Sequence, residues 1–145
     1  MTSQATETAA IQKSVVVPLP VEKAFRLFTD GIGTWWPFET HSIEGDKVEN
    51  AHFDLESKRL YERTADGTEH DWGDILAWEP PSRFLLGWRV NPENAATEVE
   101  VRFAPEGEGT RVELEHRGWE KCGPGERSSY DAGWDYVLGK LGEAA

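Results

Sequence analysis

The chain has 145 residues and a formal net charge of −12, because 27 aspartates and glutamates outnumber 15 lysines and arginines. So acidic a surface repels phosphate groups, and we expect neither a nucleic-acid partner nor a membrane surface as a partner. No apolar run is long enough for a membrane span or a signal peptide, and the lone Cys122 excludes an internal disulfide, so we expect a cytoplasmic protein. The first residues are small and polar, which predicts a disordered tail over 1–10 and a single domain over 11–145.

The domain is expected to begin with one strand and two short helices. Residues 11–18 become rich in β-branched side chains, which is typical of a strand. Apolar side chains at helical spacing predict a short helix over 21–28. A second short helix is expected between Asp30, which can cap it, and Pro37, which ends it.

From residue 43 onward apolar and polar side chains alternate, which is the pattern of antiparallel strands with one buried face. Turn residues separate the strands, whose expected ranges are 48–55, 58–64, 70–78, 83–90, 97–103 and 111–117. A long amphipathic helix is expected over 125–141. Its apolar face consists of Tyr130, Trp134, Val137, Leu138 and Leu141.

These elements predict an α+β domain in which a sheet of six or seven antiparallel strands curls around the long C-terminal helix. Such a sheet rarely closes on a helix without a gap, and the chain has seven tryptophans that must line a core, a cavity or an interface. We therefore expect a cavity for a small apolar or aromatic ligand, with the helix pair at 21–36 as a lid. The candidate residues that would line or gate the cavity are Trp35, Trp36, Trp72, Trp88, Phe103, His116, Tyr130 and Trp134.

Four stretches cover nearly all of the chain and are specific as a set: IQKSVVVPLPVEKAFRLFTDGIGTWWP at 11–37, YERTADGTEHDWGDILAWEPPSRFLLGW at 61–88, TEVEVRFAPEGEGTRVELEHRGWE at 97–120 and GWDYVL at 133–138. With them the chain resembles the SRPBCC superfamily, also called START-like or helix-grip. It is most similar to the branch of bacterial proteins that look like the C-terminal domain of the activator of the heat-shock protein 90 ATPase. The resemblance implies a first strand, two short helices, a six-strand antiparallel run and a long C-terminal helix. Ser57 and Lys58 stand where relatives usually carry paired glycines, so a different turn is expected there.

Few residues are candidates for chemistry. His116 shares the inward parity of its strand and could be a general base, but a hydrogen-bonded interior histidine is the favoured interpretation. By strand parity His70 faces the same side as Asp74, and His52 the same side as Asp54, yet neither pair supplies three or four metal ligands. The sequence has no Gly-rich phosphate loop, GxSxG or HExxH motif. We therefore assign no catalytic residue, no metal and no cofactor.

The favoured function is a non-enzymatic protein, monomeric or homodimeric, that binds a small hydrophobic or aromatic ligand. The resemblance keeps open a co-chaperone-like module that binds a protein partner. A cyclase, dehydratase or hydrolase is the third and least favoured hypothesis. It ranks last because no acid and base can be paired firmly by geometry. A structure that shows the volume of the cavity would best distinguish these hypotheses.

Overall fold

The computed structural model describes residues 9–90, 96–121 and 126–145. Residues 1–8 of the expected tail, and Cys122, lie outside the described residues.

Seven strands form one antiparallel sheet with the order β1-β7-β6-β5-β4-β3-β2. Each strand pairs with its neighbour in an antiparallel register. The strands span β1 Ile11–Val17, β2 Val48–Asp54, β3 Arg59–Thr64, β4 Glu69–Glu79, β5 Arg83–Trp88, β6 Thr97–Glu106 and β7 Gly109–Arg117. The expected sheet of six or seven antiparallel strands is therefore confirmed, because each alternating segment buries one face.

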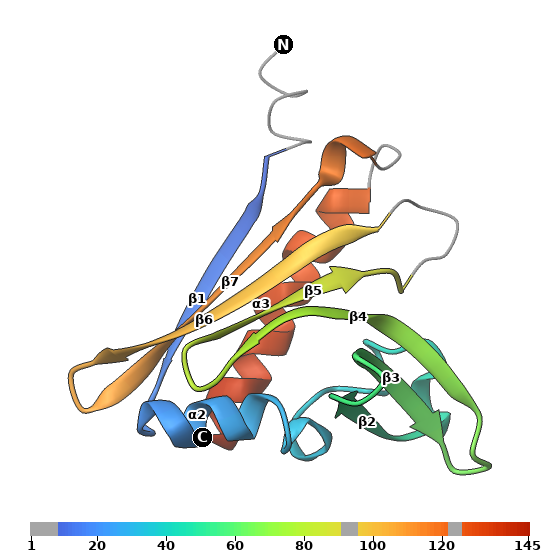
Figure 1. The fold of residues 1–145 in the computed structure, drawn as a ribbon, viewed down its shortest axis with the longest axis horizontal. Helices are drawn as coiled ribbons and strands as arrows, with labels where there is room; N and C mark the ends of the chain where they lie inside the picture. Colours follow the sequence, from blue (N-terminus) through green and yellow to red (C-terminus); the bar gives the residue numbers. More distant parts are fainter. Residues whose placement is uncertain (1–8, 91–95, 122–125) are drawn as a thin grey trace.

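Two α-helices accompany the sheet, α2 at Val21–Phe28 and α3 at Glu126–Ala144. Figure 1 shows α3 running along the sheet toward α2, near which the chain ends. The long helix is confirmed, and its Trp134 is buried as the amphipathic pattern requires. The second short helix is reduced to a single 3₁₀ turn, η1 at Ile32–Thr34, and two further turns are η2 at Gly45–Lys47 and η3 at Trp119–Lys121.

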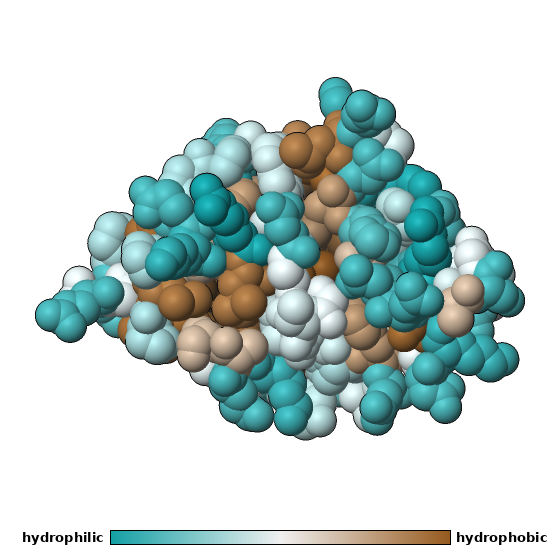
Figure 2. All heavy atoms as spheres, turned by 90° about the horizontal axis from the view of Figure 1, so that it is seen from below, coloured by the Kyte–Doolittle hydropathy of each residue, from teal (hydrophilic) through white to brown (hydrophobic). Residues whose placement is uncertain are grey.

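The core contains two neighbouring groups of aromatic side chains. At the α2 end, Phe25 packs edge-on against Trp78, Phe84 and Phe103, with ring centroids 5.1–6.1 Å apart. The second group consists of tryptophans and lies between the sheet and α3. Seen from the α2 end, hydrophobic side chains reach the surface in separate groups among hydrophilic ones (Figure 2).

Strand β4 is long and irregular, and it turns the last part of the sheet away from β5 (Figure 1). Its register shifts against β3 beside Trp72 and against β5 beside Leu76. Gly73 permits the close approach to β5, since a Cβ there would lie 2.4 Å from the carbonyl oxygen of Gly87. The two irregularities bend the strand and change which side chains share a face.

The turn between β2 and β3 contains Ser57 and Lys58 in place of paired glycines, and its conformation is set by other residues. Lys58 adopts a left-handed conformation with a φ of 56°. The Asp54 carboxylate accepts hydrogen bonds from the backbone N–H groups of Glu56 and Ser57, at 3.1 and 3.3 Å. A side-chain acceptor thus organises this turn without glycine.

Candidate functional site

A cavity of about 310 Å³ lies between the sheet and α3, beside the segment that precedes β2. Five of the eight candidate residues from the sequence line it: Trp36, Trp72, Trp88, Tyr130 and Trp134. The other lining residues are Thr40, His41, Ser42, Val90, Ser129, Gly133 and Val137. The volume is at the lower end of the range of about 300–1,000 Å³ that small-molecule sites occupy.

The four indoles that line this cavity form a closed ring of contacts with one another. Neighbouring ring centroids lie 5.0 Å apart for Trp36 and Trp72, 6.0 Å for Trp72 and Trp88, 5.6 Å for Trp88 and Trp134, and 6.0 Å for Trp134 and Trp36. Each indole is less than a tenth exposed. Since the four residues come from the segment before β2, from β4, from β5 and from α3, the fold brings distant parts of the chain to one wall.

Every indole N–H in this ring has a protein partner. Trp36 donates to the carbonyl oxygen of His41 at 2.8 Å, and Trp72 donates to Glu62 Oε1 at 2.7 Å. Trp88 donates to the Tyr130 hydroxyl at 3.0 Å, and Trp134 donates to His116 Nδ1 at 3.0 Å. The polar edge of each indole is therefore used, and its aromatic carbon surface is what remains for a guest.

Three of the candidate residues do not line the cavity. Trp35 packs against Phe28 and donates to the carbonyl oxygen of Leu27 at 2.8 Å. Phe103 belongs to the aromatic group at the α2 end. His116 lies behind Trp134, fully buried, and its Nε2 is 2.6 Å from Thr97 Oγ1. Burial lowers the pKa of His116 to about 3, so the ring is neutral at physiological pH.

The sequence missed one wall, the segment 37–42, because it has neither helical nor strand periodicity. Its backbone is held locally, since His41 N–H donates to the carbonyl oxygen of Pro37 at 2.9 Å and Ser42 Oγ donates to that of Phe38 at 2.5 Å. The expected lid at 21–36 contributes only Trp36 to the cavity. Gly33 is packed and not a free hinge, because a Cβ there would overlap the Asn50 side chain.

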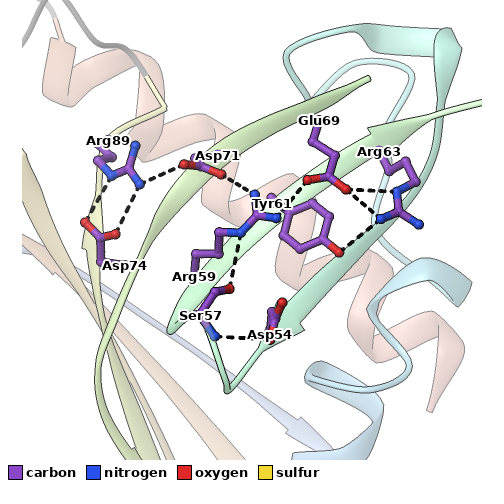
Figure 3. A network of polar contacts seen from close by, with 9 residues as sticks. All are labelled: Asp54, Ser57, Arg59, Tyr61, Arg63, Glu69, Asp71, Asp74 and Arg89. Carbon is purple, nitrogen blue, oxygen red and sulfur yellow. Dashed lines mark hydrogen bonds and ion pairs between the residues drawn. The ribbon is translucent and has the colours of Figure 1, made fainter. Parts of the chain in front are cut away.

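A network of ion pairs covers the face of β3 and β4 that points away from α3 (Figure 3). Arg59 contacts Glu69 at 2.7 Å and Asp71 at 2.8 Å, and Arg89 contacts Asp71 at 2.9 Å and Asp74 at 3.0 Å. The hydrogen bond from Arg59 holds the pKa of Asp71 below its usual value. These carboxylates are paired with arginines and turned away from the cavity, which fits a structural role for them.

The network also overturns the parity argument for His70 and Asp74. The irregularity beside Trp72 places Asp74 with Asp71 on Arg89, whereas His70 Nε2 lies 2.7 Å from Glu44 Oε2. A strand of regular alternation would have kept His70 and Asp74 on one side.

Comparison with known protein families gives a match over most of the chain. The family model described as "Activator of Hsp90 ATPase homolog 1-like protein" matches residues 18–145. No curated protein matches the chain. Among residues that the structure describes, no helix is long and apolar enough to cross a membrane.

Solved structures with this fold include proteins of different activities. The anthrahydroquino-γ-pyrone synthase Txn09 is 37% identical, with 87% of each chain covered and a TM-score of 0.59. The self-sacrificing resistance protein CalC from Micromonospora echinospora is 26% identical, with 95% of this chain and 94% of CalC covered and a TM-score of 0.71. The Aha1 dimer from Colwellia psychrerythraea shares the fold at 16% identity, with 94% of this chain and 95% of that chain covered and a TM-score of 0.65.

Proposed function

The chain belongs to the family of activator of Hsp90 ATPase homolog 1-like proteins, and from this premise we propose that it binds a small aromatic ligand in the cavity between sheet and α3. Proteins with this fold have several activities, so the function of this chain must be argued from the residues of its site. The observation that carries it is the ring of four indoles whose N–H groups are all bonded within the protein.

Such a ring favours a flat, apolar guest for a physical reason. Aromatic pairs are stabilised in offset or edge-to-face contact, with centroids about 4.5–7 Å apart. The indoles already adopt these spacings with one another, and their carbon surfaces border an unfilled volume. A planar aromatic molecule would extend the same contacts into the cavity and remove apolar surface from water.

Two relatives are consistent with a small organic ligand. Txn09, at 37% identity, is named as a synthase of a ring compound, and CalC, at 26%, is named as a resistance protein. The name of Txn09 supports the proposal only by indicating that a protein of this fold makes an organic ring compound, and the name of CalC identifies no ligand.

Gly133 offers a direct test, because it lines the cavity within an otherwise regular helix. Gly133→Leu places a side chain in the cavity and should weaken binding of 2-naphthol and 2-hydroxyanthraquinone by about tenfold or more, measured by isothermal titration calorimetry. The matched control is Gly139→Leu on the same helix, where an added Cβ meets nothing within 4 Å. That control should bind within about twofold of the unaltered protein.

If neither compound binds the unaltered protein, the proposal is refuted. Equal loss of affinity in both variants would contradict the placement of the ligand, since only Gly133 borders the cavity.

Ring-forming catalysis is the second candidate, and the named activity of Txn09 is the observation that favours it. The two candidates differ in what happens to a bound compound. A binding protein returns its ligand unchanged by mass spectrometry, whereas an enzyme returns a product whose formation is lost in Gly133→Leu.

A further inference from the structure

One polar side chain at the cavity, His41, has a ring nitrogen without a partner among the described residues. Its Nδ1 lies 2.6 Å from Thr40 Oγ1, and the structure records no contact for Nε2. The same nitrogen lies 3.7 Å from the position that a Cβ of Gly133 would occupy, so it lies beside α3 at a point where both residues line the cavity.

The His41 ring is fixed in position by its surroundings. It stacks on Tyr136 with centroids 5.0 Å apart and an interplanar angle of 17°. Its backbone carbonyl accepts the Trp36 indole N–H at 2.8 Å, and its backbone N–H donates to Pro37. One of the four indoles and the histidine are thus held to each other, so Nε2 has a defined place relative to the aromatic wall.

The chemistry of this nitrogen narrows the class of ligand. Burial lowers the pKa of His41 and so favours the neutral imidazole. In a neutral ring, the contact with Thr40 Oγ1 leaves Nε2 either an acceptor or a donor, depending on the tautomer. A hydroxyl group satisfies both cases, because it can donate to Nε2 or accept from it.

We propose that His41 Nε2 recognises a hydroxyl group on the ring of the aromatic ligand, so that the cavity selects phenols over unsubstituted aromatic hydrocarbons. This inference rests on the proposed function and refines it. The indoles supply stacking that any flat ring would use, while His41 Nε2 supplies a directional contact that distinguishes a phenol.

The test compares 2-naphthol with 2-fluoronaphthalene, which has the same ring system and similar size but no hydroxyl. The unaltered protein should bind 2-naphthol about five- to tenfold more tightly, as one hydrogen bond provides. His41→Phe retains a ring that can stack on Tyr136 but has no nitrogen. It should bind both compounds equally, with the affinity for 2-fluoronaphthalene within about twofold of the unaltered protein.

His52→Phe is the matched control, since His52 is also half-buried beside a tyrosine but does not line the cavity. It should retain the full preference for 2-naphthol. Equal affinities for the two compounds in the unaltered protein would overturn the role of His41 while leaving aromatic binding intact. A preference that persists in His41→Phe would overturn it as well. If neither compound binds, the aromatic site itself is refuted together with the role of His41.

Discussion

At the scale of single residues, His116 supports the cavity wall from behind. An indole N–H can only donate, so the bond from Trp134 makes His116 Nδ1 an acceptor. In the neutral ring Nε2 then carries the hydrogen and donates to Thr97 Oγ1. Protonation would place a second N–H against that of Trp134, within a fully buried site.

This arrangement predicts a pH-dependent stability. The pKa of His116 is lowered by burial from 6.5 in the unfolded chain to about 3 in the folded protein. Its contribution is therefore complete above about pH 6.5. As the pH falls from there toward 3, the unfolded chain binds a proton that the folded protein does not. The free energy of unfolding then falls by up to about 1.4 kcal/mol per pH unit.

Urea denaturation of the unaltered protein and of His116→Gln at about pH 7.5, 6 and 5 measures this effect. The variant should be less stable by about 1–3 kcal/mol at pH 7.5, because Trp134 or Thr97 loses its partner, and its stability should vary less with pH. The control His52→Gln should keep most of the pH dependence, because His52 is half-buried on β2. A His116→Gln protein with an unchanged pH dependence would contradict the assignment.

At the scale of elements, Glu62 on β3 connects the segment before β2 to the sheet. Its fully buried carboxylate accepts from the backbone N–H groups of Ile43 at 2.7 Å and Glu44 at 2.9 Å, and from the Trp72 indole at 2.7 Å. One side chain thus joins β3, β4 and the loop that continues from the cavity wall. A carboxylate suits this place because it only accepts hydrogen bonds when ionised.

Replacing Glu62 by glutamine should loosen this junction. The amide keeps one acceptor oxygen but turns an N–H₂ group toward a donor, which costs about 1–3 kcal/mol of stability. Glu69→Gln is the control, since its carboxylate is partly exposed and pairs with Arg59 and Arg63, and it should cost less stability than Glu62→Gln. Both costs are read from thermal or urea denaturation, and equal values would exclude a special role for Glu62.

The sequence predicted the strands well wherever alternation is regular, and it failed where the backbone departs from regularity. For β6 and β7 the inward side chains follow from parity alone. On β4 the register shift beside Trp72 places Asp74 on the same side as Asp71. No pattern in the sequence predicts this shift. Segment 37–42 was missed as a cavity wall because its shape depends on backbone hydrogen bonds that leave no periodic signal.

At the scale of the molecule, the sheet and α3 form one packed unit. Apolar side chains of α3, including Trp134, Val137 and Leu141, are buried with those of the sheet in a single cluster. Lys13 on β1 contacts Asp131 and Asp135 of the helix at 3.0 and 3.1 Å. The helix is therefore part of the core.

This packing predicts a single cooperative unfolding transition. Tryptophan emission reports on the region between sheet and helix, and far-ultraviolet circular dichroism reports on the secondary structure. Both should give the same midpoint in urea, as two-state unfolding requires. Loss of the emission change at a lower urea concentration than the loss of circular dichroism would indicate that the helix side opens separately.

The overall architecture was the most predictable level of all. Periodicity gave the order of strands and helices, and the resemblance gave their arrangement. The set of aromatic residues was predicted only in part, because parity assigns a side chain to a face but not to a position along that face. Trp88 and Phe103 share the concave face, yet only Trp88 borders the cavity.

The rim of the cavity has a consequence for how this protein can change over evolutionary time. The four indoles are buried and hydrogen-bonded, so nearly any replacement there harms folding. At the rim, Ser129 is exposed and Val90 is half-buried, and substitutions at such positions typically cost less stability than substitutions in the core. Descendants of a duplicated gene could therefore diverge in ligand preference by drift at the rim while the aromatic wall stays the same.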